Sequence, residues 1–216
     1  MCELVGGYAL TADALGEPSV PAARLPAYDA AKASQRSTPV ALGVLAPSHA
    51  YRRSPLTVVL GASAPQRPIR SLRDLSGIRL GCENDTLSCA ILMRYGGGRL
   101  AAQTTHLVPG SGVLELLQKG AYQATLIELS RFDAYRAAHP HSDLRATGYY
   151  HSLAFNIGFV ALKRNHRLLR KVDAVIERML ASGEIEAMAR RAGLTYVAPR
   201  APLAQARIPA AALSGD

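Results

Sequence analysis

Several features that would point directly to a function are missing from this chain of 216 residues. It has no tryptophan, and no aromatic residues lie among its densest group of basic residues, so an aromatic platform for stacking nucleic-acid bases is not expected. No apolar run approaches the roughly 18 residues of a membrane span. Residues 1–10 lack the basic region of a signal peptide, and the chain turns polar within about a dozen residues. Taken alone, these absences indicate a soluble, cytoplasmic globular protein.

Motifs of the common enzyme classes are missing as well. The sequence has no Gly-x-Ser-x-Gly elbow, no phosphate-binding Walker loop and no helix with two metal-binding histidines. The stretch Gly110-Ser111-Gly112 is better explained as the start of a helix, with Ser111 as its N-cap. We therefore predict that the protein is not an enzyme and carries no cofactor.

The spacing of the three cysteines in the sequence is not that of a metal site. Cys82 and Cys89 are seven residues apart, with no second pair and no histidine at ligand spacing nearby, and Cys2 is left over. We expect Cys82 and Cys89 to be two buried thiols. A disulfide between them, across the loop that separates them, is the alternative in an oxidising compartment.

The basic charge of the chain suggests a nucleic-acid partner at first. The net charge is +9 and the isoelectric point is about 9.8. The basic residues are scattered, however, and no aromatic residues lie among the densest group of them. That group lies on an amphipathic helix whose other face is apolar: Lys163, Arg164, Arg167, Arg170 and Lys171. We interpret it as a solvated helix face and predict no nucleic-acid partner.

An alternation of strands and helices is what the sequence does contain. Apolar strands are predicted at 78–82 and 124–127, with a helix from 113 to a stop at Gly120 between them. Two amphipathic helices follow at 168–180 and 185–192, and each ends close to a glycine. This rhythm predicts an α/β fold whose parallel sheet is covered on both faces.

The loop after the first of these strands is the strongest lead to function. Where a strand is followed by a helix, the first backbone N–H groups of the helix have no partners and the positive end of the helix dipole is exposed there. Asp85, Thr86 and Ser88 lie beside those groups in the sequence. The pattern predicts a site for an anionic or strongly polar group.

The order of these segments resembles solute-binding protein family 3, the type II periplasmic receptors that serve ABC transporters of polar amino acids. Residues 71–77 resemble the start of the second lobe in that family, and Asp85-Thr86 resembles its Gly-Thr turn. The segments 114–128 and 168–194 follow in the family's order. The resemblance implies an α/β fold of two lobes with mixed, mostly parallel sheets, an interlobe hinge and an incomplete first lobe.

The resemblance also implies a division of the chain. Residues 1–57 and 152–198 would form the incomplete first lobe, 58–151 the second lobe, and the Ala/Pro-rich residues 199–216 a disordered tail. Because residues 2–7 resemble a strand that family members place in the interior of the first lobe, we expect the chain to be truncated at its N-terminus. A complete protein of this family would be periplasmic.

The resemblance places a ligand between the lobes. The residues that it implicates are Asp85, Thr86, Leu87, Ser88, Glu128 and Tyr51. Glu128 is at the acidic position that binds an ammonium group in the family. The arginine that clamps the α-carboxylate of the ligand falls on Ala41 in one register and on Ala14 in another, so it is absent in both. A bidentate guanidinium is hard to replace, and we expect common α-amino acids to bind poorly.

The function implied is that of a monomeric periplasmic protein that binds a small polar solute and delivers it to an ABC permease in the inner membrane. The alternative rests on a second resemblance, of residues 2–7 and 51–58, to a branch of the family found beside quinoprotein (PQQ) alcohol dehydrogenases. That branch implies an accessory role with a periplasmic quinoprotein dehydrogenase as the partner. A dehydratase-like enzyme or a sensor domain would share the fold and is less favoured.

Overall fold

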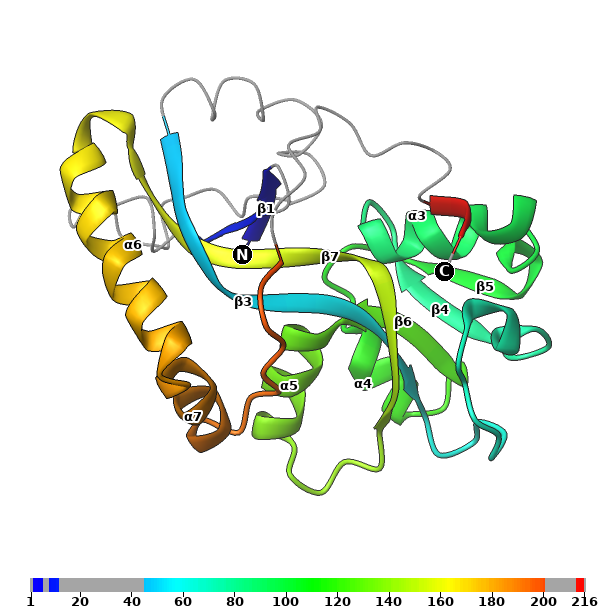
Figure 1. Ribbon diagram of the computed structural model, residues 1–216. Helices are drawn as coiled ribbons and strands as arrows, with labels where there is room; N and C mark the ends of the chain where they lie inside the picture. Colours follow the sequence, from blue (N-terminus) through cyan, green and yellow to red (C-terminus); the bar gives the residue numbers. More distant parts are fainter. Residues whose placement is uncertain (1, 6–7, 12–44, 201–212, 216) are drawn as a thin grey trace. The chain divides into compact units, whose positions relative to one another are not determined.

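The computed structural model describes residues 2–5, 8–11, 45–200 and 213–215. The chain divides into two compact units, the first made of Met1–Ser54 and Phe155–Ala206, the second of Pro55–Ala154 and Arg207–Asp216. Two long strands, β3 (Leu45–Leu60) and β7 (Arg145–Leu162), each continue from one unit into the other (Figure 1).

The second unit contains β6, β4, β5 and parts of β3 and β7, in the sheet order β7-β3-β6-β4-β5. The strand β6 (Ala124–Glu128) pairs antiparallel with β3 and parallel with β4 (Leu80–Glu83), and β4 pairs parallel with β5 (Thr104–Leu107). All of β4 and all but the last residue of β6 are buried, as expected for central strands that are covered on both faces. The sheet is therefore mixed, with its parallel part in the middle.

Three α-helices cover these strands. The helix α3 (Leu87–Arg94) contacts all three of the strands β4, β5 and β6, α4 (Val113–Gln118) contacts β4 and β6, and α5 (Leu129–Ala138) contacts β6 (Figure 1). The core cluster between the elements is apolar and aromatic: Val59, Val113, Leu114, Leu117, Tyr122, Ile127, Phe132, Tyr135 and Leu144. Burial of this cluster, together with other buried side chains of the unit such as Leu80, Ile91 and Leu126, stabilises it.

One glycine of β4 has a steric role in this core. A Cβ atom at Gly81 would lie 2.4 Å from the ring of Tyr122, so no other residue fits without displacing the ring. The hydroxyl of Tyr122 donates to the carbonyl of Val113, at the start of α4. Burial raises the pKa of Tyr122, helped by the charges of Glu83 and Glu115, so the hydroxyl stays protonated and remains a donor.

Of the two predictions about the ends of α4, the one for its start is wrong and the one for its end is confirmed. The N-cap of α4 is Gly112, not Ser111. The Gly112 carbonyl accepts from Leu116 N at 3.0 Å, and the Gly112 backbone is left-handed with φ 76°. The sequence prediction was one residue early because a left-handed glycine at this turn shifts the helix start. The predicted stop at Gly120 is confirmed by its left-handed backbone.

The chain enters β4 through a short 3-10 helix, Leu72–Leu75, that is capped by a carboxylate. Asp74 Oδ2 accepts from the backbone N–H groups of Arg70 at 2.8 Å and Ser71 at 3.0 Å. These hydrogen bonds lower the pKa of Asp74 below its ordinary value of 3.8. The turn before Gly77 is thus held by a charged cap.

Replacing Asp74 by Ala should lower the free energy of unfolding by about 0.5–1 kcal/mol at neutral pH, the lower end of the range for lost caps because the carboxylate is largely solvated. Since the native pKa is lowered, the stabilisation is present above pH 3.8 and is lost as the pH falls through the native pKa. Denaturant titrations in neutral and acidic buffer measure both effects. Asp143→Ala, on an exposed residue, is the control; equal losses in the two variants would contradict the capping role.

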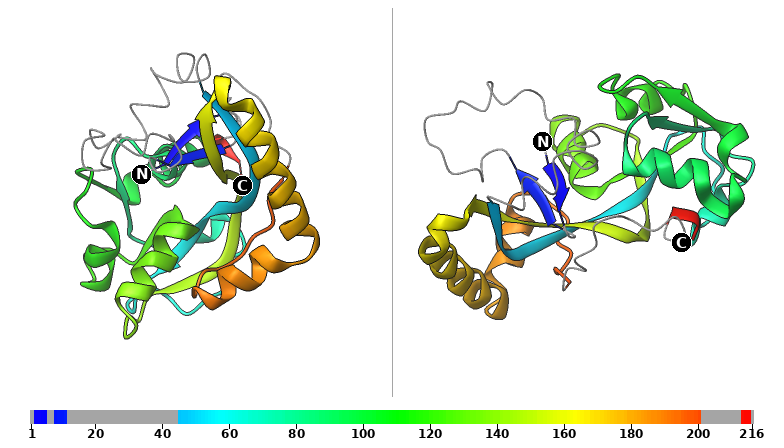
Figure 2. Two further views of the ribbon diagram at one scale, coloured as in Figure 1. Left: turned by 90° about the vertical axis from the view of Figure 1, so that its left-hand side faces the viewer. Right: turned by 90° about the horizontal axis from the view of Figure 1, so that it is seen from above.

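The first unit has the strand order β1-β2-β7-β3, with β1 (Cys2–Val5) antiparallel to β2 (Tyr8–Thr11) and β2 parallel to β7. It also contains the helices α6 (His166–Ala181) and α7 (Glu184–Arg191), seen in Figure 2 in yellow-orange and orange. Backbone N–H of His49, on β3, donates to Asp173 of α6 at 2.7 Å, and His49 Nδ1 lies 2.9 Å from Glu177. These contacts join the helix to the strand.

The five basic residues of the densest group are all exposed: Lys163 and Arg164 lie in the 3-10 helix that follows β7, and the other three lie at the start of α6. A solvated helix face accounts for them. Among the described residues, no helix combines the length and the apolar character that crossing a membrane requires. The predicted tail falls mainly on residues outside those that the structure describes, as do Ala14 and Ala41.

Candidate functional site

The candidate site lies where β4 and β6 end. The two strands are parallel neighbours, and their last residues are Glu83 and Glu128. From this edge the chain turns into α3 after β4 and directly into α5 after β6. In open α/β sheets, ligands bind outside the carboxyl ends of parallel strands, where loops and helix N-termini gather. We refer to this place as the carboxyl edge.

The loop from β4 to α3 adopts the turn that the sequence predicts. Asp85 is left-handed, with φ 61°, which is the only such non-glycine residue in the described part of the chain. A left-handed aspartate replaces the glycine that the resemblance places at this turn, because a short polar side chain tolerates that conformation. Asp85 itself is exposed.

Thr86 is the N-cap of α3. Its Oγ1 accepts from Cys89 N at 3.2 Å, donates to the Glu83 carbonyl at 2.7 Å, and lies 3.0 Å from Ser88 Oγ. The hydroxyl of Thr86 is therefore used within the loop. The helix geometry provides no intrahelical acceptor for the N–H groups of Leu87 and Ser88. Those backbone groups, at the positive end of α3, are the donors that a ligand could use.

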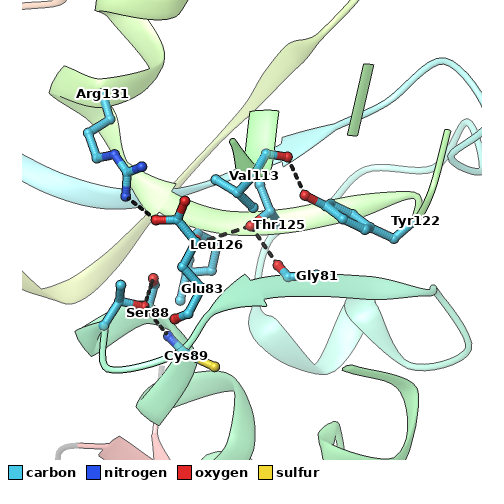
Figure 3. A network of polar contacts seen from close by, with 10 residues as sticks. Gly81, Glu83, Ser88, Cys89, Val113, Tyr122, Thr125, Leu126 and Arg131 are labelled. Carbon is cyan, nitrogen blue, oxygen red and sulfur yellow. Dashed lines mark hydrogen bonds and ion pairs between the residues drawn. The ribbon is translucent and has the colours of Figure 1, made fainter. Parts of the chain in front are cut away.

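An ion pair that sequence reasoning missed crosses this edge. Arg131, in the first turn of α5, places Nη1 3.0 Å from Glu83 Oε2, as Figure 3 shows. Glu83 is buried, whereas the side chain of Arg131 is 48% exposed. The two residues are 48 positions apart in the sequence, so no local pattern could reveal the pair.

One carboxylate oxygen of this pair is unsatisfied. Glu83 Oε1 is buried and has no hydrogen-bond partner among the described residues. A buried acceptor without a partner is costly, and such groups often mark a place where a ligand or water binds. Glu83 therefore joins the candidate site.

Glu128 is half-buried and precedes the first residue of α5. Its Oε1 accepts from Ser130 Oγ at 2.7 Å. This hydrogen bond orients the carboxylate at the end of β6 without neutralising its charge. Glu128 is thus placed to attract a cationic or donor group, as the sequence predicts, although the binding itself stays a prediction.

The predicted site residues fall into two groups in the structure. Thr86, Leu87 and Ser88 start α3, with Asp85 just before them, and Glu128 ends the neighbouring strand of the same unit. Tyr51 belongs to the first unit, where its ring packs against Phe159 with a centroid distance of 5.3 Å. That all six contact one ligand stays a prediction.

The expectation of two free thiols is wrong. Cys82 and Cys89 form a disulfide, with an S–S distance of 2.06 Å and a Cα–Cα distance of 5.1 Å. The turn at Asp85 brings the end of β4 and the first turn of α3 to the separation that a disulfide needs. A histidine that sequence spacing does not indicate lies beside the disulfide: His106 Nδ1 is 3.9 Å from Cys89 Sγ. His106 is on β5, in register with Cys82, and sequence spacing does not reveal neighbours across strands.

A hollow of about 330 Å³ lies elsewhere in the second unit. Its lining includes Leu60, Gln66, Arg67 and Arg145. Leu60 pairs with Ala124 at the start of β6, so the hollow is at the opposite end of the strands from the carboxyl edge. It contains none of the predicted site residues, and Arg67 is engaged there by the carbonyls of residues 74 and 76.

Comparison with known proteins identifies the fold. No protein-family model and no curated protein matches the chain. Among solved structures, the L-cystine solute receptor of Neisseria gonorrhoeae in its unliganded open conformation is similar, with a TM-score of 0.57, 17% identity, and coverage of 76% of this chain and 66% of that one. The second substrate-binding domain of Lactococcus lactis GlnP, also open, has a TM-score of 0.57, 17% identity, and coverage of 80% and 75%. The chain has the type II solute-binding protein fold.

A third solved structure has the same fold with a ligand bound. It is an amino acid ABC transporter substrate-binding protein from Streptococcus pneumoniae with L-arginine, at a TM-score of 0.51, 19% identity, and coverage of 74% of this chain and 66% of that one. The chain spans just under two thirds of the receptor from Neisseria gonorrhoeae. The predicted fold class is confirmed, and so is the resemblance to family 3 at the level of fold. That this chain is not an enzyme stays a prediction.

Proposed function

We propose that the chain is the periplasmic solute-binding component of an ABC-type uptake system, with an inner-membrane permease as its partner. The observation that carries the proposal is the composition of the carboxyl edge: the N-terminus of α3, the unsatisfied oxygen of Glu83 and the carboxylate of Glu128 gather where ligands bind in α/β folds. The similar structures, which are an L-cystine solute receptor, a substrate-binding domain and an amino acid ABC transporter substrate-binding protein, support the solute-binding role. The accessory role beside a quinoprotein dehydrogenase rests on the sequence resemblance alone.

The site residues favour a ligand with two kinds of end. The N–H groups of Leu87 and Ser88, with the positive end of α3, favour an anionic or hydrogen-bond-accepting group. Glu128 and the Glu83 Oε1 atom favour an ammonium or another donor. Arg131 has further guanidinium donors beside the Nη1 atom that contacts Glu83. A small zwitterionic or mixed polar solute satisfies both sets.

The proposal is tested by isothermal calorimetry on the chain with three ligand classes. Polyamines offer only positive ends, dicarboxylates only negative ends, and zwitterions other than common α-amino acids offer both. We expect the third class to bind most tightly, and common α-amino acids to bind poorly because the carboxylate-clamping arginine is replaced by alanine in either register, Ala41 or Ala14.

Two outcomes would contradict the proposal. One is the absence of a binding heat for every class. The other is binding that is unchanged in Arg131→Met, since this substitution leaves the Glu83 carboxylate without its cation and alters the charge of the edge. Circular dichroism of the variant confirms that it is folded before the titration.

A further inference from the structure

Three residues with metal-binding side-chain atoms, two sulfurs and one imidazole nitrogen, converge beside the carboxyl edge on three different elements. Cys82 is on β4, Cys89 is in the first turn of α3, and His106 is on β5. Their ligand atoms all lie within 4.8 Å of one another. The convergence follows from the fold: β4 and β5 are parallel with Cys82 and His106 in register, and α3 contacts both strands.

The cluster is oxidised in the structure, since the two sulfurs form a disulfide. Reduction would break the S–S bond, with two electrons and two protons converting it to two thiols. A trialkylphosphine does this in water and becomes a phosphine oxide, with the oxygen taken from water. The released sulfurs stay near each other because both residues are buried and their backbones are anchored in β4 and α3.

The imidazole of His106 is held in place by two further side chains. Its Nε2 lies 3.2 Å from Met93 Sδ, and its Nδ1 lies 2.6 Å from Asn84 Oδ1. Met93 is on the same face of α3 as Cys89, four residues later. Met93, on the Nε2 side, is the partner that can orient the ring while Nδ1 binds an ion. The ring is exposed to solvent and its Nδ1 faces Cys89 Sγ. An ion that binds Nδ1 takes the place of the proton and of the hydrogen bond to Asn84 Oδ1.

We propose that reduction of the Cys82–Cys89 disulfide creates a Cys₂His site for a soft d¹⁰ metal ion, Cu⁺ or Zn²⁺. Two thiolates and one imidazole bind Cu⁺ and Zn²⁺ in preference to Mg²⁺ or Ca²⁺, which take oxygen ligands. The N-terminus of α3 favours a negative charge on Cys89. Binding releases the thiol protons and any proton on His106 Nδ1. The proposal stands on these three residues and does not depend on the solute-binding role of the carboxyl edge.

The experiment uses the full chain in a Cys2→Ser background, so that the remaining cysteine cannot contribute. The protein is reduced with a trialkylphosphine, desalted without oxygen, and titrated with Cu⁺ against bathocuproine disulfonate and, separately, with Zn²⁺ against a chromogenic chelator. The reduced chain should bind one ion per chain in at least one arm, and the oxidised chain none. The arm with the higher affinity identifies the preferred ion.

Variants separate the proposed site from incidental binding. Cys82→Ser with Cys89→Ser should abolish stoichiometric uptake. His106→Ala should weaken it at least about tenfold, because loss of even an outer partner of a ligand has that effect, whereas His141→Ala, on another exposed histidine of the same unit, should leave it unchanged. The idea is overturned if the reduced chain takes up neither ion, or if His106→Ala matches His141→Ala. His106 is exposed, so this comparison holds even where the cysteine variants do not fold.

Discussion

Replacing Phe132 by Ala should lower the free energy of unfolding of the second unit by about 3–5 kcal/mol. Phe132 is 2% exposed and lies in an apolar cluster of that unit, and the guanidinium of Arg136 lies 5.6 Å from its ring centroid. Removal of the ring leaves a cavity beneath α5, because β6 and α4 cannot close around an alanine. The helix that carries Arg131 loses one of its buried apolar residues and keeps Leu129 and Tyr135.

Thermal and denaturant unfolding, followed by circular dichroism, measures the loss. Val108→Ala is a matched control in the same unit, because Val108 is 74% exposed and its truncation should change stability by less than about 0.5 kcal/mol. A Phe132→Ala loss no larger than that of Val108→Ala would show that α5 is not held by this core. Since two units are present, the transition of each should be followed separately.

Replacing Glu128 by Gln should weaken the binding of a cationic or zwitterionic solute by about 1.5–3 kcal/mol, or roughly 10- to 150-fold, if the carboxylate makes a charged hydrogen bond to it. Glutamine keeps the size of the side chain and can still accept from Ser130 Oγ, so the change acts mainly on charge. Calorimetry with the tightest solute of the three classes measures the loss.

Glu115→Gln is the control for this prediction, because Glu115 is an exposed carboxylate on α4 of the same unit. Thr86→Ala should cost less binding than Glu128→Gln, since the hydroxyl of Thr86 is used within its own loop and the backbone N–H groups remain. Tight binding of a common α-amino acid, with no loss in Glu128→Gln, would refute the site as described.

The local sequence pattern was sufficient to predict the helix, strand and turn that form the carboxyl edge. The helix before Gly120 and the strand from Ala124 are present where apolar spacing and glycine positions predict them, with β6 extending one residue beyond the predicted 124–127. The turn at Asp85 and the capping role of Thr86 also follow from neighbours in the sequence. Periodicity, caps and left-handed turns depend on residues a few positions apart, and a single sequence contains all of that information.

The sequence by itself therefore determined the α/β class, the loop that opens α3 and the acidic residue that ends β6. Only the tertiary structure decided which distant groups meet there: Arg131 with Glu83, and His106 with the cysteines. It also decided that Cys82 and Cys89 form a disulfide, which the sequence left as the less favoured alternative. Strand order and register set these distances, and both are selected by the burial of the whole sheet, so no segment of the chain encodes them alone.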